Sequence, residues 1–334
     1  MKNIFFILIG SFFVFVSVGF SSEAKPKNLV NNPGFETNTA GWKMAKEAAR
    51  DEDESYSGKA SIKIEGNPEQ SIYVSYTVGI QAKPGQVVEV TAWSRSEGTT
   101  QKLNNYFMAV EAYPEAGGVE YLPKANFSNC PHSWEKRRCR FEVTKSLKKM
   151  RIMLMYRKQT GTAWFDDISL VVKNKSERII TGNLVQNPGF EEDGFADWDF
   201  RAGKGVVYKL DTSAPHAGAK CFMMTGSGKS EPDARILQPL LYLKGGKNYT
   251  LRFYVKTKDL QSVRAIARVR ELPSGKDTFI NLTRSSGTKD WTAYSQNLTI
   301  QKNTSSISLQ FYLRSKGIMW LDDISFKFVN KEGK

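Results

Sequence analysis

The sequence predicts an all-β protein made of two β-sandwich domains in tandem. A nine-residue stretch, Asn28–Glu36, returns as Asn183–Glu191 with a single difference, and Trp164–Leu170 returns as Trp320–Phe326. The two offsets, 155 and 156 residues, agree, so each copy is a whole domain. Short-period solenoids, whose repeats run to roughly 20–50 residues, are excluded.

Alternation of apolar and polar residues is the second observation behind this fold class. Strong helix signals are missing, and clusters of Gly, Pro, Asn and Ser bound short alternating runs, a pattern typical of sandwich strands. The first copy contains Ser61–Ile64, Ile72–Val78, Val88–Ser94, Tyr106–Ala112, Arg140–Val143 and Arg151–Arg157. The second contains Cys221–Met224, Tyr249–Lys256, Ala265–Glu271, Asn297–Ile300 and Ser308–Arg314.

The expected domain plan has four parts. Residues 1–24 read as a signal peptide, because Lys2 precedes an apolar run that ends at a small-residue cleavage site around Ala24. A retained anchor helix is the alternative. We then expect a sandwich over 25–173, a polar linker over 174–182 and a second sandwich over 183–330. If the signal peptide is cleaved, we expect a secreted or periplasmic protein. No other segment of the sequence is expected to cross a membrane.

Charge and cysteine content limit the expected partners and disulfides. The formal charge is +14, spread as +5 over residues 25–173 and +7 over 183–329, without a dense basic tract. Nucleic acid is therefore not an expected partner, whereas an acidic polysaccharide or an anionic envelope suits a mildly basic surface. Cys130 and Cys139 are close enough in sequence to pair as a local disulfide, leaving Cys221 unpaired.

The repeated ends resemble a known family. Asn28–Glu36, the following Gly41-Trp42 and Asp197-Trp198, and the closing Asp-Asp-Ile-Ser stretch are similar to the CenC-type carbohydrate-binding modules of families 4, 9, 16 and 22. This resemblance implies a galactose-binding-domain-like jelly roll in each copy. It also implies a structural calcium away from the sugar, and sugar-stacking aromatic residues on a concave sheet.

Two pairs of carboxylates are the candidate calcium ligands. We expect Asp166 to share the core side of its strand with Ile168, and Asp167 to face the other way, because successive strand residues point to opposite faces. Glu36 with Asp166, and Glu191 with Asp322, then supply hard oxygen ligands suited to one calcium per domain. The alternative is that these carboxylates accept backbone N–H groups of nearby loops. Opposed carboxylates cannot flank one glycosidic bond, so catalysis by the Asp pair is not expected.

Candidate ligand contacts follow from strand parity. Trp93 and Tyr254 occupy the same outward position in the two copies, and aromatic rings stack on the apolar faces of pyranoses. Guanidinium groups in the second copy suit the carboxylate or sulfate groups of an acidic polysaccharide. The predicted ligand residues are Trp93, Arg95, Glu111, Met155 and Arg157 in the first domain, and Arg252, Tyr254, Arg268, Arg270, Tyr312 and Arg314 in the second. The alternative for Trp93 and Tyr254 is that each exposed ring stabilises cross-strand pairing. The alternative for the basic residues is that they form a solvated sheet face.

The expected function is non-catalytic polysaccharide binding, with glycoside hydrolases of the same system as further partners. Two weak sites on one chain raise avidity for a polymer that reaches both. A structural or protein-interaction role on the same fold is the alternative, and an accessory part of a glycoside hydrolase system is a third. Trp42, Trp134, Trp198 and Trp291 are expected to be structural.

Overall fold

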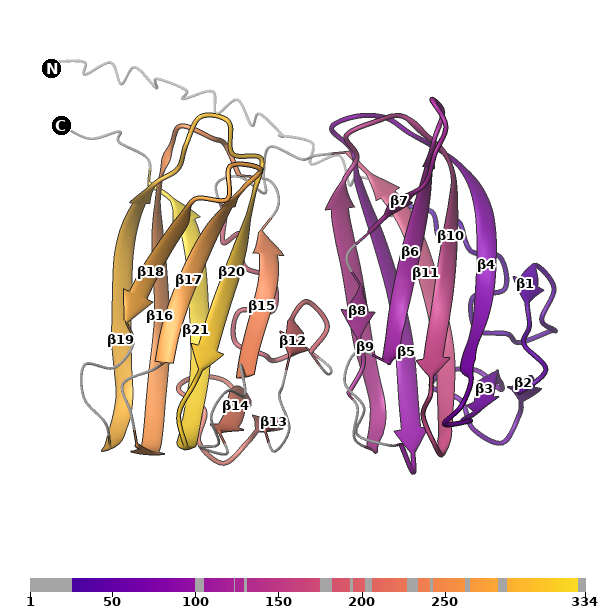
Figure 1. Ribbon diagram of the computed structural model, residues 1–334, viewed down its shortest axis with the longest axis horizontal. Helices are drawn as coiled ribbons and strands as arrows, with labels where there is room; N and C mark the ends of the chain where they lie inside the picture. The colour runs from indigo at the N-terminus through magenta and orange to yellow at the C-terminus, as the bar shows by residue number, and fades with distance from the viewer. Residues whose placement is uncertain are drawn as a thin grey trace, which may run out of the picture.

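The computed structural model contains two β-sandwiches that lie side by side (Figure 1). It describes residues 26–99, 105–122, 124–128, 131–174, 182–192, 195–201, 206–226, 234–240, 243–261, 265–281 and 287–329. This part of the chain consists of strands, turns and loops, with no helix and hence no helical membrane span. The all-β, two-domain prediction is confirmed.

The first sandwich is built from eleven strands in two sheets. One sheet has the order β1-β4-β10-β6-β7, with β8 also paired to β6, and the other has the order β2-β3-β11-β5-β9. The strands are β1 Trp42–Lys43, β2 Ala48–Asp51, β3 Ser61–Glu65, β4 Ser71–Ala82, β5 Val87–Glu97, β6 Tyr106–Pro114, β7 Glu120–Tyr121, β8 Ala125–Asn126, β9 His132–Glu142, β10 Leu147–Arg157 and β11 Thr162–Lys173.

The second sandwich repeats this plan with sheets β12-β15-β20-β17-β18 and β13-β14-β21-β16-β19. Its strands are β12 Asp199–Arg201, β13 Val207–Asp211, β14 Cys221–Gly226, β15 Ala234–Leu240, β16 Asn248–Leu260, β17 Ala265–Leu272, β18 Asp277–Asn281, β19 Gly287–Thr299, β20 Ser306–Leu313 and β21 Gly317–Phe328. The predicted linker residues 175–181, the signal peptide and Cys130 lie outside the described residues, so those expectations remain predictions.

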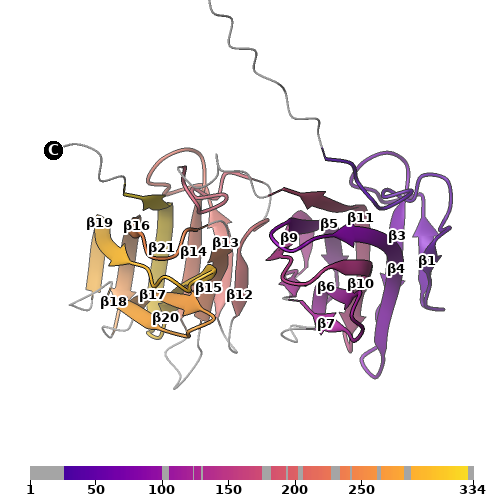
Figure 2. The same cartoon turned by 90° about the horizontal axis from the view of Figure 1, so that it is seen from above.

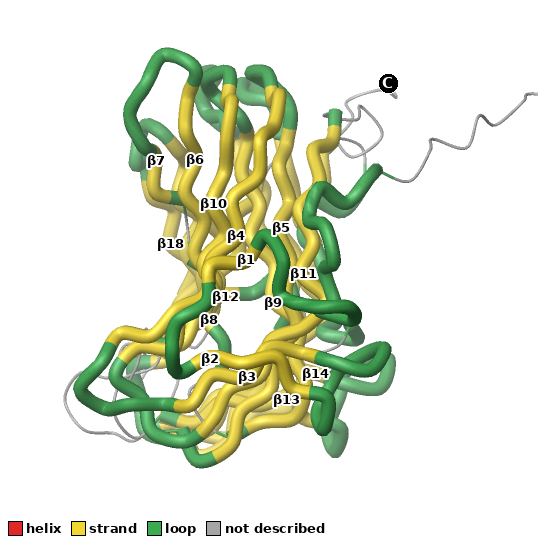
Figure 3. The backbone as a smooth tube through the Cα atoms, turned by 90° about the vertical axis from the view of Figure 1, so that its right-hand side faces the viewer, coloured by secondary structure: helices red, strands yellow, loops and turns green. Residues whose placement is uncertain are grey.

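The two sandwiches present corresponding sheets to the same side of the molecule. Figure 2 shows β6, β7 and β10 of the first domain and β15, β17, β18 and β20 of the second along its lower edge. We call the sheets that contain these strands the front sheets, and the other two the back sheets. The tube view of Figure 3 shows long loops beside the strands β2, β3, β13 and β14 of the back sheets.

The core of each sandwich follows from strand parity. On β10, Ile152, Leu154 and Tyr156 are fully buried, and on β20 Leu309 and Phe311 are buried in the same way. Their alternates point out of the sandwich, because side chains along a strand alternate between faces. The alternation expected over Arg151–Arg157 and Ser308–Arg314 is therefore confirmed. Trp42 and Trp198 are buried as well, as expected for structural residues.

The repeated opening segment ties the start of each domain to its last strand. Asn28 donates from Nδ2 to the carbonyl of Ile168 at 3.1 Å and accepts from the Leu170 N–H at 2.9 Å. Asn183 makes the same two bonds, to Ile324 at 3.0 Å and from Phe326 at 2.9 Å. Each segment thus closes its sandwich like a clasp.

Candidate functional site

The structure divides the predicted ligand residues between opposite faces of each sandwich. Trp93 and Arg95 lie on β5 and Arg252 and Tyr254 on β16, all in the back sheets. The other predicted residues belong to the front sheets. Glu111, Met155 and Arg157 lie on front-sheet strands of the first domain. In the second domain Arg268 and Arg270 lie on β17 and Tyr312 on β20, which Arg314 directly follows. The predicted set therefore does not form one site per domain.

Trp93 is covered by the loop that follows β2. Its ring stacks on that of Tyr56, with centroids 3.6 Å apart, and only 7% of Trp93 is exposed. Arg95 forms ion pairs with Glu54 of the same loop and with Glu97. A ring sandwiched in this way offers no free face to a sugar, so the contacts match the structural role of an aromatic residue more closely than ligand stacking.

Tyr254 repeats this arrangement with a different partner. The imidazole of His216, from the loop after β13, stacks on Tyr254 with centroids 3.7 Å apart. Trp134 lies beside Tyr56 with its ring tilted, and Trp291 lies edge-on beside His216. The equivalence of Trp93 and Tyr254 is confirmed, because they pair in register with Asp166 and Asp322.

The side assigned to Asp166 is wrong, and a β-bulge explains why. The pairing of β11 with β5 shifts register between Asp166 and Ser169, and Asp167 adopts a φ of 47°. The extra residue restores Ile168 to the core while Asp166 stays on the outer side, beside Trp93. Asp166 and Asp167 consequently both turn toward the clasp. The same bulge occurs at Asp323.

The carboxylates of the clasp accept backbone N–H groups from the covering loops. Asp166 Oδ2 accepts from Tyr56 at 2.8 Å and Ser57 at 3.0 Å, and Glu36 Oε2 accepts from Lys59 at 2.8 Å. In the second domain, Asp322 accepts from His216 and Glu191 from Ala219. Burial raises the pKa of Asp166, and likewise that of Asp322, to about 6. The alternative to calcium, in which these carboxylates accept backbone N–H groups of nearby loops, predicts such hydrogen bonds, and they are present.

The clasp also offers donors of the kind that calcium prefers. A Cβ on Gly34 would lie 3.2 Å from Glu36 Oε1, 3.3 Å from Asp167 Oδ1 and 3.4 Å from Asp166 Oδ1. Oxygen atoms alone converge there, which fits the chemistry of a hard cation. Among the described residues, however, no three His, Cys, Asp or Glu side chains are arranged as a set of metal ligands.

The front face of the first domain combines aromatic rings with an ion pair in which the carboxylate is buried and the guanidinium is partly exposed. Tyr73, Met155 and Phe107 are register partners across β4, β10 and β6 and form one outward row. In the next part of the face, Glu111 is 5% exposed and accepts from Arg151 Nε at 2.9 Å and Tyr113 Oη at 2.7 Å. Burial alone would raise the pKa of Glu111, but these bonds hold it below its ordinary value.

The front face of the second domain is dominated by arginine. Arg268 binds both carboxylate oxygens of Asp277, at 2.9 and 2.6 Å, and donates to Tyr312 Oη at 3.2 Å. Arg314 lies over the Tyr312 ring, and Arg235 reaches its hydroxyl. The hydrogen bonds that Arg268 donates to Asp277 raise the pKa of this guanidinium above its ordinary value. Of the predicted basic row, Arg268 and Arg314 contact Tyr312 and Arg270 shares Asp277 with Arg268, whereas Arg252 lies on a back sheet.

Four exposed apolar side chains on the front sheets are not among the predicted ligand residues. Tyr73 and Tyr121 in the first domain, and Leu272 and Phe279 in the second, are 36%, 79%, 38% and 59% exposed. Tyr121 pairs with Glu111, and Phe279 pairs with Arg268, which places both on the outward face. Strand parity was the available signal for Tyr73, because it alternates with the buried Ile72 and Val74.

Comparisons with known proteins identify the family. The family model described as "Carbohydrate binding domain" matches residues 27–162 and again 182–317. The chain belongs to this family. The resemblance inferred from the repeated motifs is therefore confirmed in both copies. Among curated proteins, none matches this sequence.

Several solved carbohydrate-binding modules are similar to the chain at low identity. The tandem CBM22-1–CBM22-2 domain of Paenibacillus barcinonensis Xyn10C is 14% identical over 92% of this chain and 100% of its own, with a TM-score of 0.34. A family 16 module is 16% identical over 43% of this chain and 99% of its own, with a TM-score of 0.35. TmCBM61, solved with β-1,4-galactotriose, is 17% identical over 43% and 97%, with a TM-score of 0.32.

Proposed function

We propose that the protein binds polysaccharide, without cleaving it, on the front sheets of both domains. Membership of the carbohydrate-binding family over both copies supports the ligand class. The exposed rings carry the choice of face, because Tyr73, Tyr121 and Phe279 point outward from the front sheets, whereas the exposed Tyr56 over a back sheet already stacks on Trp93. Rings exposed beside buried polar groups are suited to the apolar faces and hydroxyls of sugars.

The orientation of the two front sheets supports binding of one polymer by both domains. The sheets lie on the same side of the molecule in Figures 1 and 2. A chain bound to one face is then held near the other, which raises the effective concentration for the second contact. Engagement of Asp166 and Glu36 in the clasp supports a non-catalytic role for these carboxylates.

We further propose that the second domain prefers an acidic polysaccharide. Arg235, Arg268 and Arg314 contact Tyr312, and Asp277 pairs with Arg268 and with the neighbouring Arg270. The face thus keeps an excess of guanidinium groups, which bind carboxylates and sulfates through paired N–H donors. Weaker retention by polygalacturonate than by a neutral galactan would overturn this preference.

Affinity electrophoresis of the full chain tests the proposed face. Tyr73→Ala and Arg270→Ala change the two front sheets, and Arg252→Ala removes an exposed arginine from a back sheet as the matched control. In a gel that contains a polysaccharide that retards the wild type, we expect both front-sheet variants to migrate faster than the wild type. The control variant is expected to be retarded as strongly as the wild type. Equal retention of all three would rule out the front sheets as the binding faces.

A structural calcium in each clasp, and export of the chain, complete the proposal. The oxygen donors around Gly34 support calcium, and its removal with a chelator is expected to lower the melting temperature of both domains. Unchanged melting would count against it. The apolar run before Ala24 supports secretion, for which mass spectrometry of the exported protein should give an N-terminus at Lys25. Glycoside hydrolases acting on the same polymer are the proposed partners.

A further inference from the structure

Two neighbouring cross-strand rows on the first front sheet are mostly apolar. Ser75, Met153 and Ala109 are register partners across β4, β10 and β6, and the next row contains Tyr73 and Met155. The small side chains Ser75 and Ala109 are only 4% and 9% exposed, whereas both methionines are partly exposed. The middle of this face therefore presents methionine side chains and one tyrosine ring to solvent.

Guanidinium groups flank these methionines along β10. The outward side chains of this strand alternate as Arg151, Met153, Met155 and Arg157, and both arginines are partly exposed. A guanidinium donates hydrogen bonds but accepts none. The carboxylate of this face, Glu111, is 5% exposed and already accepts from Arg151. Along β10 the face thus offers donors and apolar surface to a ligand, while its carboxylate is withdrawn.

The matching positions of the second domain have the opposite character. On β20, which is the third strand of its front sheet as β10 is of the first, Gln310 and Tyr312 stand in place of Met153 and Met155. Gln310 accepts from the Tyr312 hydroxyl and donates to Ser308 at 2.8 Å. Amide and phenol groups both donate and accept. The methionines are therefore a feature of the first face and not a requirement of the shared fold.

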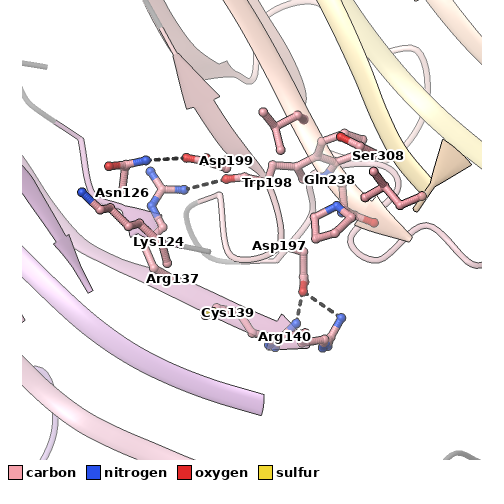
Figure 4. Close-up of a pocket in the computed structure, with 15 residues that line it drawn as sticks. Lys124, Asn126, Arg137, Cys139, Arg140, Asp197, Trp198, Asp199, Gln238 and Ser308 are labelled. Carbon is pink, nitrogen blue, oxygen red and sulfur yellow. Dashed lines mark hydrogen bonds and ion pairs between the residues drawn. The ribbon is translucent and has the colours of Figure 1, made fainter. Parts of the chain in front are cut away.

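The second domain is docked against the β8 and β9 side of the first. Arg137 on β9 is 1% exposed, and its guanidinium lies 4.6 Å from the ring centre of Phe200 in the second domain. Arg140 forms an ion pair with Asp197 at 3.0 Å, shown in Figure 4, and donates to Glu89 at 2.6 Å. This side of the first domain is therefore covered by the interface.

A lysine and the same interface cover the β6 end of the apolar rows. Lys124 Nζ lies 4.1 Å from the ring centre of Phe107, which is 2% exposed. Asn126, the register partner of Phe107 on β8, donates to Asp199 of the second domain at 2.8 Å. The apolar surface that is open to a ligand is consequently that of the β10 methionines and of Tyr73.

We propose that the first front face selects a polysaccharide that carries O-acetyl groups. An acetyl ester replaces a hydroxyl by a methyl group and a carbonyl oxygen, which accepts hydrogen bonds but donates none. The methyl group packs on the flexible methionine side chains, and the carbonyl accepts from Arg151 or Arg157. A free hydroxyl over Met153 or Met155 would exchange water for a thioether and lose a good acceptor. The inference rests on the proposed function for the binding face and for polysaccharide as the ligand class.

Affinity electrophoresis of the full chain with matched polymers tests this selection. The probes are O-acetylated xylan and O-acetylated glucomannan, each compared with the same polymer after mild alkaline deacetylation. We expect at least one acetylated polymer to bind with a dissociation constant about fourfold lower than that of its deacetylated form, the gain from one buried methyl group. If neither acetylated polymer is bound more tightly than its deacetylated form, the proposal is overturned.

A single substitution locates the selection. Met153→Gln installs the amide that the second domain has at Gln310, and Met153→Leu is the matched control that keeps the position apolar. We expect the preference for the acetylated polymer to disappear in the first variant and to remain in the second. If melting shows that Met153→Gln is unfolded, Met155→Gln decides instead. An unchanged preference in the folded variant refutes the role of the methionines.

The two proposals fail separately in these experiments. Tyr73→Ala is expected to weaken retention of the acetylated and the deacetylated polymer alike, because the proposed face itself is changed. The ratio between the two forms reports the acetyl selection alone. Retention that depends on Tyr73 but not on acetylation would keep the binding face and reject the acetyl ligand.

Discussion

The two domains are nearly identical where the fold is closed and differ where ligand would bind. In both, an asparagine bonds the last strand just after its bulge, and an aspartate accepts the N–H groups of a covering loop. On the front sheets the similarity ends. The first domain pairs the buried Glu111 with the partly exposed Arg151 and carries exposed tyrosines, whereas the second has arginines packed around Tyr312.

This difference separates scaffold from selectivity. Groups buried at the clasp must be satisfied by fixed partners, so any change there costs folding free energy. Outward groups on a sheet face tolerate exchange, because most surface substitutions change stability by only about 0.5 kcal/mol. The residues that distinguish the two copies are accordingly those to which the proposed function assigns the selection of a sugar.

The largest predicted effect is loss of the buried aspartate of one clasp. Asp166→Ala leaves the N–H groups of Tyr56, Ser57 and Asp167 without their acceptor. At about 1–3 kcal/mol per unsatisfied group, we expect a loss of about 4 kcal/mol in the first domain. Denaturant unfolding followed domain by domain measures this, and Asp322→Ala should affect the second domain alone. Equal destabilisation of both domains by either variant would contradict separate clasps.

Uncoupling of the domains should follow from a change at Arg137. Arg137→Met keeps the apolar stem but leaves Glu135, itself buried, without the guanidinium that bonds it at 3.1 Å. We expect a loss of about 3 kcal/mol, as for other broken buried pairs, and a larger radius of gyration by small-angle scattering. Arg157→Met, on the front sheet away from the interface, is the control and should leave the scattering unchanged.

Acidification should weaken the interface more than the clasps, through Glu89. Burial raises the pKa of this carboxyl, but Arg140, Lys173 and Arg138 outweigh it and lower the pKa to about 2. A lowered pKa stabilises the fold above the ordinary value of 4.5, and this stabilisation is lost as pH falls toward 2. Between pH 5 and pH 3 we expect a loss of about 2 kcal/mol that is absent in Glu89→Gln. The same pH slope in variant and wild type would contradict this role.

Much of this architecture could be predicted from the sequence, because repeats and alternation depend on local pattern. The matched offsets gave two domains, and the clasp followed from motifs at both ends. Parity failed at Asp166, since a bulge adds one residue without any change in the alternating pattern. Only the left-handed Asp167 reveals it.

The choice of binding face could not be predicted in the same way. Strand parity says which residues point outward, but not which sheet a strand joins or which outer face a loop covers. Trp93 and Met155 both point outward, yet they lie on opposite sheets, and Tyr56 covers Trp93 from 37 residues away in sequence. Such coverage depends on tertiary packing. Because Tyr56 covers Trp93, we place the proposed binding faces on the front sheets.

The smallest predicted effect concerns the one covering ring that differs between the clasps. Tyr56→His and His216→Tyr exchange the two rings while keeping the backbone N–H groups bonded to Asp166 and Asp322. Stacking on Trp93 or Tyr254 is open to either ring, so each variant should lose less than about 1 kcal/mol. His216→Tyr should lose more, because His216 Nδ1 also contacts Asp323 Oδ2 at 2.6 Å. Thermal melts of the two variants check the order. Retained polysaccharide binding in both is expected, since these rings serve the back sheets, and lost binding would return the ligand to Trp93 and Tyr254.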